Sequence, residues 1–395
     1  MEQTRLARPV QILLATIFVA NTGTYMALQF LAVYLTVLLH FAAWQVATVL
    51  TASLLCRNLL PLGLGLMSDR VGHIRLVILG LVFEGVGFLI YSSFDRFAGA
   101  ILAAALVGSG AACVRPAVSA IVAAQPEAQR KLAFARFNQA LNAGVIVGPL
   151  LGSALVVLSP VLPFRGGGLL FFLLAIVLFI NRSVFVTVRG SKPMITTMRT
   201  VLGHRRFVAF GGIMILFFIL FAQLQVSLPL EALRRGHSNS LVSAVFLVNG
   251  IAGLLLMLGL ARIFRQQHPL RLVRYGVFCT GLGFALIALS SAPFWLLVCV
   301  AIYTLGETLV LPAQDMLVAE FSAENAHRDS GAFFGIFMVT GAIGGTIGNY
   351  LGTTLMQEGG TIFPWVIYGA IGVVGGGLLT MLQPQNISLH EVTYP

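Results

Sequence analysis

Gly65 to Arg75 reads Gly-Leu-Met-Ser-Asp-Arg-Val-Gly-His-Ile-Arg and stands between two long apolar runs. An acid, two arginines and a glycine turn are concentrated in this short stretch, whereas the residues around it are almost all apolar. Because apolar segments flank it closely on both sides, we expect a short loop at a membrane edge that joins two spanning helices.

The composition of the whole chain independently indicates a membrane protein. Of its 395 residues, 58% are hydrophobic and 9% are charged, and the mean hydropathy is +0.94, which a soluble protein of this length does not tolerate. At about 20 residues per crossing, we expect an all-α protein with twelve transmembrane helices, roughly at 10–38, 43–66, 74–93, 97–123, 134–158, 167–187, 207–232, 240–263, 271–290, 293–320, 331–357 and 362–382. The first helix lacks a small-residue cleavage site and is expected to stay as an anchor.

The basic residues give the expected orientation. With the N-terminus placed in the cytoplasm, most of the 24 Lys and Arg residues fall in cytoplasmic loops, and the outer loops hold only Arg96, Arg165, Arg234 and Arg235. This asymmetry is the positive-inside rule. We therefore expect both termini in the cytoplasm. Separately, we expect the protein to be a monomer in a bacterial inner membrane. The net charge of +11 does not indicate nucleic acid, because no clustered basic face with exposed aromatics is present.

Several classes of site are not expected. The four cysteines fall within apolar segments without Cys-x-x-Cys spacing, and the histidines are scattered, so we expect no disulfide, metal or cofactor. No phosphate-binding Gly-x4-Gly-Lys-Ser/Thr occurs, so ATP is not the expected energy source. A membrane-embedded enzyme would need a nucleophile–base or metal cluster, and none is visible.

The chain contains an internal repeat. Displaced by 196 positions, Gly110–Ala123 lies over Gly306–Ala319, and the two segments share Gly, Val, Pro-Ala and Val-Ala at matching places. We therefore expect two pseudo-symmetric six-helix bundles related by an axis along the membrane normal. The expected domains are an N-terminal bundle over 1–187, a basic cytoplasmic linker over 188–206 and a C-terminal bundle over 207–395.

The opening loop resembles the signature loop between the second and third helices of the major facilitator superfamily. Gly65, Asp69, Arg70 and Gly72 match it, while Arg75 follows one place later than the family's basic residue. The resemblance implies that Asp69 accepts hydrogen bonds at the start of the eleventh helix, near Ser330 and Gly331, and locks the cytoplasmic side shut. The alternative is a loop whose charges only stop translocation, although acids contribute little to topology.

A second motif lies in the expected fifth helix. Gly144, Gly148, Pro149 and Gly152 form a stripe that permits close helix approach, and the proline kinks the helix. The pattern resembles the fifth-helix motif of proton-coupled drug antiporters, with Ala135 and Ser153 replacing its outer glycines. The fourth-helix arginine and glutamine of that branch are absent. The alternative is ordinary tight helix packing.

Five ionisable side chains lie well inside the expected helices, namely Arg57, Glu84, Arg115, Glu307 and Asp315. Each costs about 2.5–3.5 kcal/mol at mid-bilayer, so each needs a cavity or a partner. Burial disfavours a charged carboxylate, so Glu307 would load and release a proton, which a cationic substrate or Arg57 and Arg115 would displace. Alternatively, Glu307 forms a static ion pair between the halves.

The other charges also keep two interpretations. Glu84 has a structural or loosely solvated role, or takes part in proton or substrate binding. Arg57 and Arg115 serve substrate or proton relay, or extend toward the cytoplasmic edge. Asp315 is a candidate for the inner gate, and Glu231, beside Arg234 and Arg235, is expected to be exposed on the outside.

The resemblance implies that helices 1, 4, 7 and 10 line a central cavity. Polar candidates for that cavity and its surroundings are Asn21, Tyr25, Gln29, Gln139, Asn142, Gln223 and Gln225. Each of them could instead hydrogen-bond to a neighbouring helix.

The sequence as a whole favours a proton-coupled secondary transporter that exports a small amphipathic or cationic molecule by alternating access, similar to the drug:H+ antiporters. The alternative is a proton-coupled importer of a sugar, peptide or siderophore, which would use the same carboxylates with opposite coupling. The expected partners are the substrate, protons and the lipid bilayer.

The topology predicts that Ser191 and Gly166 lie on opposite sides of the membrane. Cysteines introduced at the two positions in a cysteine-free background should react with an impermeant maleimide from opposite sides, Ser191 from the cytoplasm. Labelling of both from one side would contradict the twelve-helix topology.

Overall fold

The computed structural model describes residues 6–61, 72–123, 125, 127–185, 201–236, 239–323 and 330–382. The first half of the chain contains α1 (Arg8–Val33), the π-helical turn η1 (Tyr34–Leu38), α2 (Ala43–Leu59), α4 (His73–Tyr91), α5 (Phe97–Ala123), α6 (Glu127–Leu158), α7 (Leu162–Ile180) and the short η2 (Arg182–Val184). The second half contains α9 (Arg205–Ala222), α10 (Ser227–Gly236), α11 (Asn239–Gly259), α12 (Ala261–Gln266), α13 (Pro269–Ile287), α14 (Pro293–Ala323), α15 (Ser330–Glu358) and α16 (Phe363–Met381).

Among the described residues, eleven helices are long and apolar enough to cross a membrane. One of these spans, Arg205–Gly236, joins α9 and α10. The twelfth expected span corresponds to α2, which has 17 residues and lies just before the undescribed stretch 62–71. The expected all-α membrane fold is thus confirmed.

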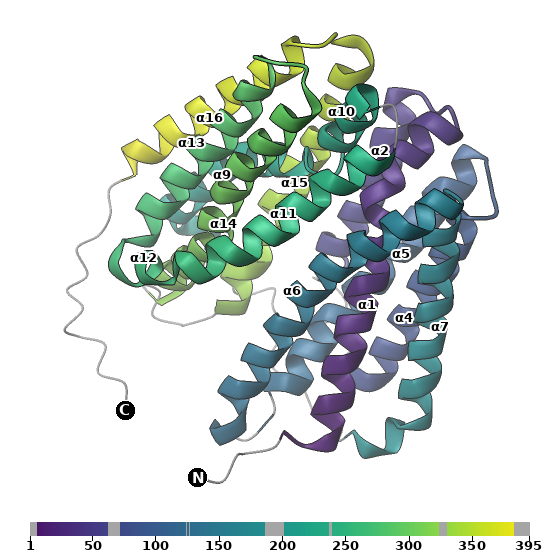
Figure 1. Cartoon of the computed structure of the whole chain (residues 1–395). Helices are drawn as coiled ribbons and strands as arrows, with labels where there is room; N and C mark the ends of the chain where they lie inside the picture. Colours follow the sequence, from purple (N-terminus) through teal and green to yellow (C-terminus); the bar gives the residue numbers. More distant parts are fainter. Residues whose placement is uncertain are drawn as a thin grey trace.

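The helices form two groups that lie side by side, α1–α7 in purple to teal and α9–α16 in green to yellow (Figure 1). We name the two ends of the molecule after α1 and η1: the Arg8 end, where α1 begins, and the Leu38 end, where η1 finishes. The two groups pack against each other through α2 with α15, α6 with α11, and α1 with α10.

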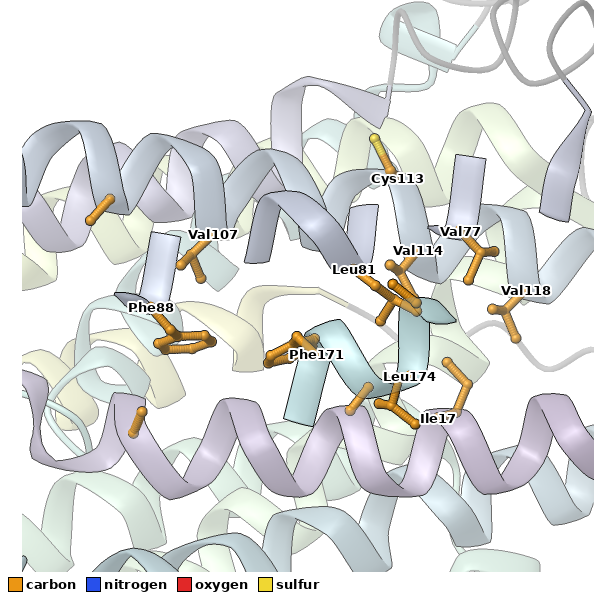
Figure 2. Close-up of a cluster of buried hydrophobic side chains, with 14 of the residues drawn as sticks. Ile17, Val77, Leu81, Phe88, Val107, Cys113, Val114, Val118, Phe171 and Leu174 are labelled. Carbon is orange, nitrogen blue, oxygen red and sulfur yellow. The ribbon is translucent and has the colours of Figure 1, made fainter. Parts of the chain in front are cut away.

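The buried apolar side chains show where the two groups are joined. One cluster lies wholly within the first group; Figure 2 shows its centre, where the rings of Phe88 and Phe171 stack at 5.6 Å. A second cluster, at the Leu38 end of the second group, also includes Phe30 of α1 and Val156 of α6. The third cluster, at the Arg8 end, contains only residues from Val201 onward among those described. Apolar packing therefore joins the groups at the Leu38 end.

Close contacts between neighbouring helices at glycines, which we call glycine seams, occur at equivalent positions in the two groups. In α4 and α5, a Cβ added at Gly80 would lie 2.6 Å from the carbonyl oxygen of Gly110; in α13 and α14, a Cβ added at Gly276 would lie 2.7 Å from that of Gly306. Both residues of the second pair stand 196 positions after those of the first. The repeat therefore preserves a close backbone contact between two helices in each group.

The glycine motif of α6 also has a counterpart. A Cβ at Gly148 would lie 2.8 Å from the carbonyl oxygen of Thr22 in α1, and a Cβ at Gly348 of α15 would lie 2.8 Å from that of Ile219 in α9. Gly144 and Gly152 face α1 in the same way, and Pro149 is buried within α6. The motif is thus a helix-packing surface in this structure.

The seams predict opposite effects for the same substitution at different glycines. Gly80→Ala and Gly276→Ala should each lower the thermal unfolding temperature in detergent, because overpacking costs about 1–3 kcal/mol. Gly212→Ala is the control, since its Cβ would meet nothing within 4 Å, and alanine is the better helix former by about 1 kcal/mol. Equal unfolding temperatures for all three variants would contradict the seams.

Candidate functional site

A cavity of about 140 Å³ lies in the first group of helices, from its middle toward the Arg8 end. α1, α2, α4, α5 and α6 supply almost all of its wall, and Met338 of α15 adds one contact from the second group. Its polar lining consists of Asn21, Thr24, Tyr25, Arg57, Asn58, Glu84 and Arg115. The structure therefore brings five of the first-half candidates into one wall: Arg57, Glu84, Arg115, Asn21 and Tyr25.

Glu84 is a lining residue that is 4% exposed. Its Oε2 accepts a hydrogen bond of 3.2 Å from the hydroxyl of Thr24 on α1, and Arg57 of α2 attracts it electrostatically. Its Cγ and its backbone nitrogen lie against Gly110, so the close approach of α4 and α5 at this glycine sets its position.

The two cavity arginines are differently placed. Arg57 is partly buried, and its Nε meets no hydrogen-bond acceptor in the described part of the chain. Arg115 is exposed where it lines the cavity, and it attracts Asp315 on α14 of the other group. Asp315 is itself exposed. These two charges thus attract each other from the two groups near the Arg8 end.

Glu307 of α14 lies apart from these charges. Its Oε2 accepts a hydrogen bond of 2.9 Å from the side-chain amide of Asn249 on α11, and the same amide donates to Thr304 over 3.0 Å. In the described part of the chain Glu307 makes no ion pair. Asn249 was not anticipated from the sequence, although an asparagine within the apolar run of α11 is a signal of the same kind.

The remaining polar candidates have other partners. Asn21 donates to the carbonyl oxygen of Leu141 over 2.6 Å, which ties α1 to α6. Gln139 accepts from Arg136 on the surface of α6, and Gln29 is buried outside the cavity lining. The side chain of Asn142 lies outside the described residues. Tyr25 lines the cavity.

Gln223 stands where the seventh span is interrupted. α9 ends at Ala222 and α10 begins at Ser227; the fully buried Gln223 donates to the carbonyl oxygens of Ile219 (2.7 Å) and Gly348 (3.0 Å). Ser227 donates to its Oε1 over 2.7 Å. Gln223 therefore stabilises the interruption between α9 and α10 and does not line the cavity. Gln225 lies in the turn between these two helices.

The signature loop is only partly described. Gly65, Asp69 and Arg70 lie outside the described residues. Gly72 precedes α4 with a φ of 92°, a conformation that favours glycine, and Arg75 is exposed in the first turn of α4.

Two hydrogen bonds link the groups toward the Leu38 end, between α2 and α15. The hydroxyls of Thr48 and Tyr350 lie 2.8 Å apart, and Asn349 donates to Thr51 over 3.3 Å. Further toward the Arg8 end, Leu54 of α2 packs against Gly345 of α15. We call this set of contacts the α2–α15 latch.

The expectation that Glu231 is exposed is wrong. It is 1% exposed, pairs with Arg234, and accepts from Nε of Arg235 over 2.5 Å. Arg235 also donates to the carbonyl oxygen of Ser290 (2.7 Å), and Arg234 to that of Gly360 (3.2 Å). Glu231 thus orients two arginines that tie α10 to its neighbours at the Leu38 end.

Comparisons with known sequences agree on one family. The sequence model of the Major Facilitator Superfamily matches residues 13–333 of this chain. An uncharacterized MFS-type transporter of Mycobacterium tuberculosis is 29% identical over 252 residues, which cover 62% of this chain and 59% of that protein. The multidrug resistance protein MdtH of Salmonella typhimurium is 26% identical over 334 residues, 80% of this chain and 81% of that protein.

Solved structures share the fold at low identity. The POT family transporter PepTSo superposes with a TM-score of 0.80 at 14% identity, covering 95% of this chain and 98% of that one. The nucleoside transporter NupG gives 0.78 at 14% identity, covering 96% and 100%. With a family match over most of its length and paired helix groups of this architecture, the chain belongs to the Major Facilitator Superfamily and is a multi-pass membrane transporter, not an enzyme.

Proposed function

We propose that the protein is a proton-coupled secondary transporter of the bacterial inner membrane, with both termini in the cytoplasm, that exports a small amphipathic or cationic molecule by alternating access. Residues 1–187 and 207–395 would act as two rigid bundles joined by the linker 188–206. The MdtH relatives, named for multidrug resistance, support export of a drug-like molecule. No second chain is needed to complete the cavity, which fits a monomer.

The observation that carries the proposal is the surroundings of Glu307. It accepts a hydrogen bond from the neutral amide of Asn249, which also donates to Thr304, and it has no cation within ion-pair distance among the described residues. A carboxylate without a countercharge costs several kcal/mol in such a setting, whereas the neutral acid does not. A group of this kind changes its proton occupancy when water reaches it in one state and not in the other.

The arrangement of the two bundles supports alternating access. The α2–α15 latch and the apolar cluster around Phe30 and Val156 close the Leu38 end. The cavity lies toward the Arg8 end, where Arg115 and Asp315 attract each other without forming an ion pair in the described residues. With the Arg8 end in the cytoplasm, this is an inward-facing state, and approach of Arg115 to Asp315 would help to close it.

Glu307→Gln should abolish pH-gradient-driven accumulation in inverted vesicles screened with dyes and antibiotics, because an amide cannot release a proton. Substrate exchange at equal pH on both sides should persist, since it requires no net proton movement. Glu358→Gln is the control, an exposed acid at the end of α15. Uphill transport by Glu307→Gln at the wild-type rate would exclude Glu307 as the proton carrier, and uptake with the opposite polarity in wild type would favour an importer.

Loss of the α2–α15 latch should favour the outward-facing state. Each hydrogen bond contributes about 0.5–1.5 kcal/mol, so Thr48→Val with Tyr350→Phe should raise its population several-fold. The readout is the rate at which impermeant maleimide, added outside, labels a cysteine placed at Leu54 behind the latch. Tyr275→Phe, an exposed tyrosine of α13, is the control; equal labelling rates in both variants would rule out the latch.

A further inference from the structure

The cavity lining carries more positive than negative charge. Its ionisable lining residues are Arg57, Arg115 and Glu84. With Glu84 ionised, the lining carries one excess positive charge; with Glu84 protonated, it carries two. A cationic substrate would therefore enter a cavity whose own charge opposes it.

Arg57 has a buried hydrogen-bond donor without an acceptor in the described part of the chain. The donor is its Nε, and leaving a buried donor of a charged group unpaired is costly. Glu84 attracts Arg57, but no ion pair within 4 Å forms between them among the described residues. Glu84 accepts instead from Thr24. The guanidinium of Arg57 thus lines the cavity with an Nε that is available to donate a hydrogen bond to a ligand.

Arg115 adds a second guanidinium. It makes no hydrogen bond or ion pair among the described residues, and it lines the same cavity. Its electrostatic attraction is to Asp315 on α14 of the other bundle. An anion that enters from the Arg8 end would therefore meet Arg115 as well as Arg57.

Apart from the polar Asn21, Thr24, Tyr25 and Asn58, the rest of the wall is apolar. Ile17 and Val114 belong to the buried cluster of the first bundle (Figure 2) and also line the cavity. Leu141 and Met338 extend the apolar wall across α6 and α15. The cavity thus has a hydrophobic surface next to the guanidinium groups of Arg57 and Arg115.

We infer that the cavity binds amphipathic molecules that carry a carboxylate, which Arg57 and Arg115 hold while the apolar wall covers the hydrophobic part. The inference rests on the proposed function and narrows its substrate from amphipathic or cationic molecules to amphipathic acids. Guanidinium groups match the planar carboxylate and bind it through paired hydrogen bonds. A single negative charge neutralises the excess charge of the lining while Glu84 is ionised, so a carboxylate matches the charge of that state.

The test uses three dyes with one fluorophore and different end charges. Dansylglycine is anionic, dansylglycinamide is neutral and dansyl-ethylenediamine is cationic. Saturable binding to the full chain in nanodiscs is measured by the fluorescence rise on transfer of the dansyl group to an apolar site. We expect dansylglycine to bind about tenfold or more tightly than either of the other dyes, the size expected for hydrogen bonds to a charged group.

Variants separate a charge effect from a loss of structure. Arg57→Gln and Arg115→Gln should each weaken dansylglycine binding about tenfold and leave dansylglycinamide unchanged. Glu84→Gln should tighten dansylglycine binding, a gain that an unfolded cavity cannot produce. Arg165→Gln, an exposed arginine at the start of α7, should match wild type.

Two results would overturn the inference. The first is equal or tighter binding of dansyl-ethylenediamine by wild type; the second is equal weakening of all three dyes by Arg57→Gln together with weaker dansylglycine binding by Glu84→Gln. Failure of the proposed function looks different: dansylglycine binds with the expected preference, but a pH gradient drives no dansylglycine across the vesicle membrane.

Discussion

An ionisable side chain inside an apolar helix must find water, a countercharge or a hydrogen-bond partner, because the hydrocarbon supplies none of them. The three acids with defined partners meet this requirement differently. Glu231 is paired with two arginines, and Glu84 shares a cavity with Arg57 and accepts from Thr24. Glu307 accepts from an asparagine amide and makes no ion pair in the described part of the chain. The first arrangement suits a fixed tie between helices, whereas the third suits a group that gains and loses a proton.

The two halves share their packing but not their charges. The glycine pairs Gly80–Gly110 and Gly276–Gly306 stand at the same offset and make the same close contact. At that offset Glu84 corresponds to Thr280, and Glu307 corresponds to Ala111. The repeat therefore keeps the backbone frame and changes the residues around it. We interpret this as a division of work, with substrate binding in the first bundle and proton binding in the second.

Much of the fold could be predicted from the sequence, because lipid imposes long apolar segments and the positive-inside rule orders them. The charges of the cavity were also found, since Arg57 and Glu84 are conspicuous in apolar helices. Neutral polar residues gave no such guidance: Asn249, which contacts Glu307, was missed, and Gln223 was assigned to the cavity although it holds the break between α9 and α10. Burial of Glu231 depends on ends of helices far apart in the chain, which hydropathy does not reveal.

If alternating access is coupled to protons through the proposed carrier Glu307, protonation of Glu307 should control which end of the molecule is open. Spin labels at Ser93 and Ser291, exposed positions at the Leu38 end of the two bundles, would report the distance between the bundles by double electron–electron resonance in a cysteine-free background. We expect the wild-type distance distribution to change with pH, and that of Glu307→Gln to be the same at every pH. A pH-dependent change in Glu307→Gln as large as in wild type would contradict the claim.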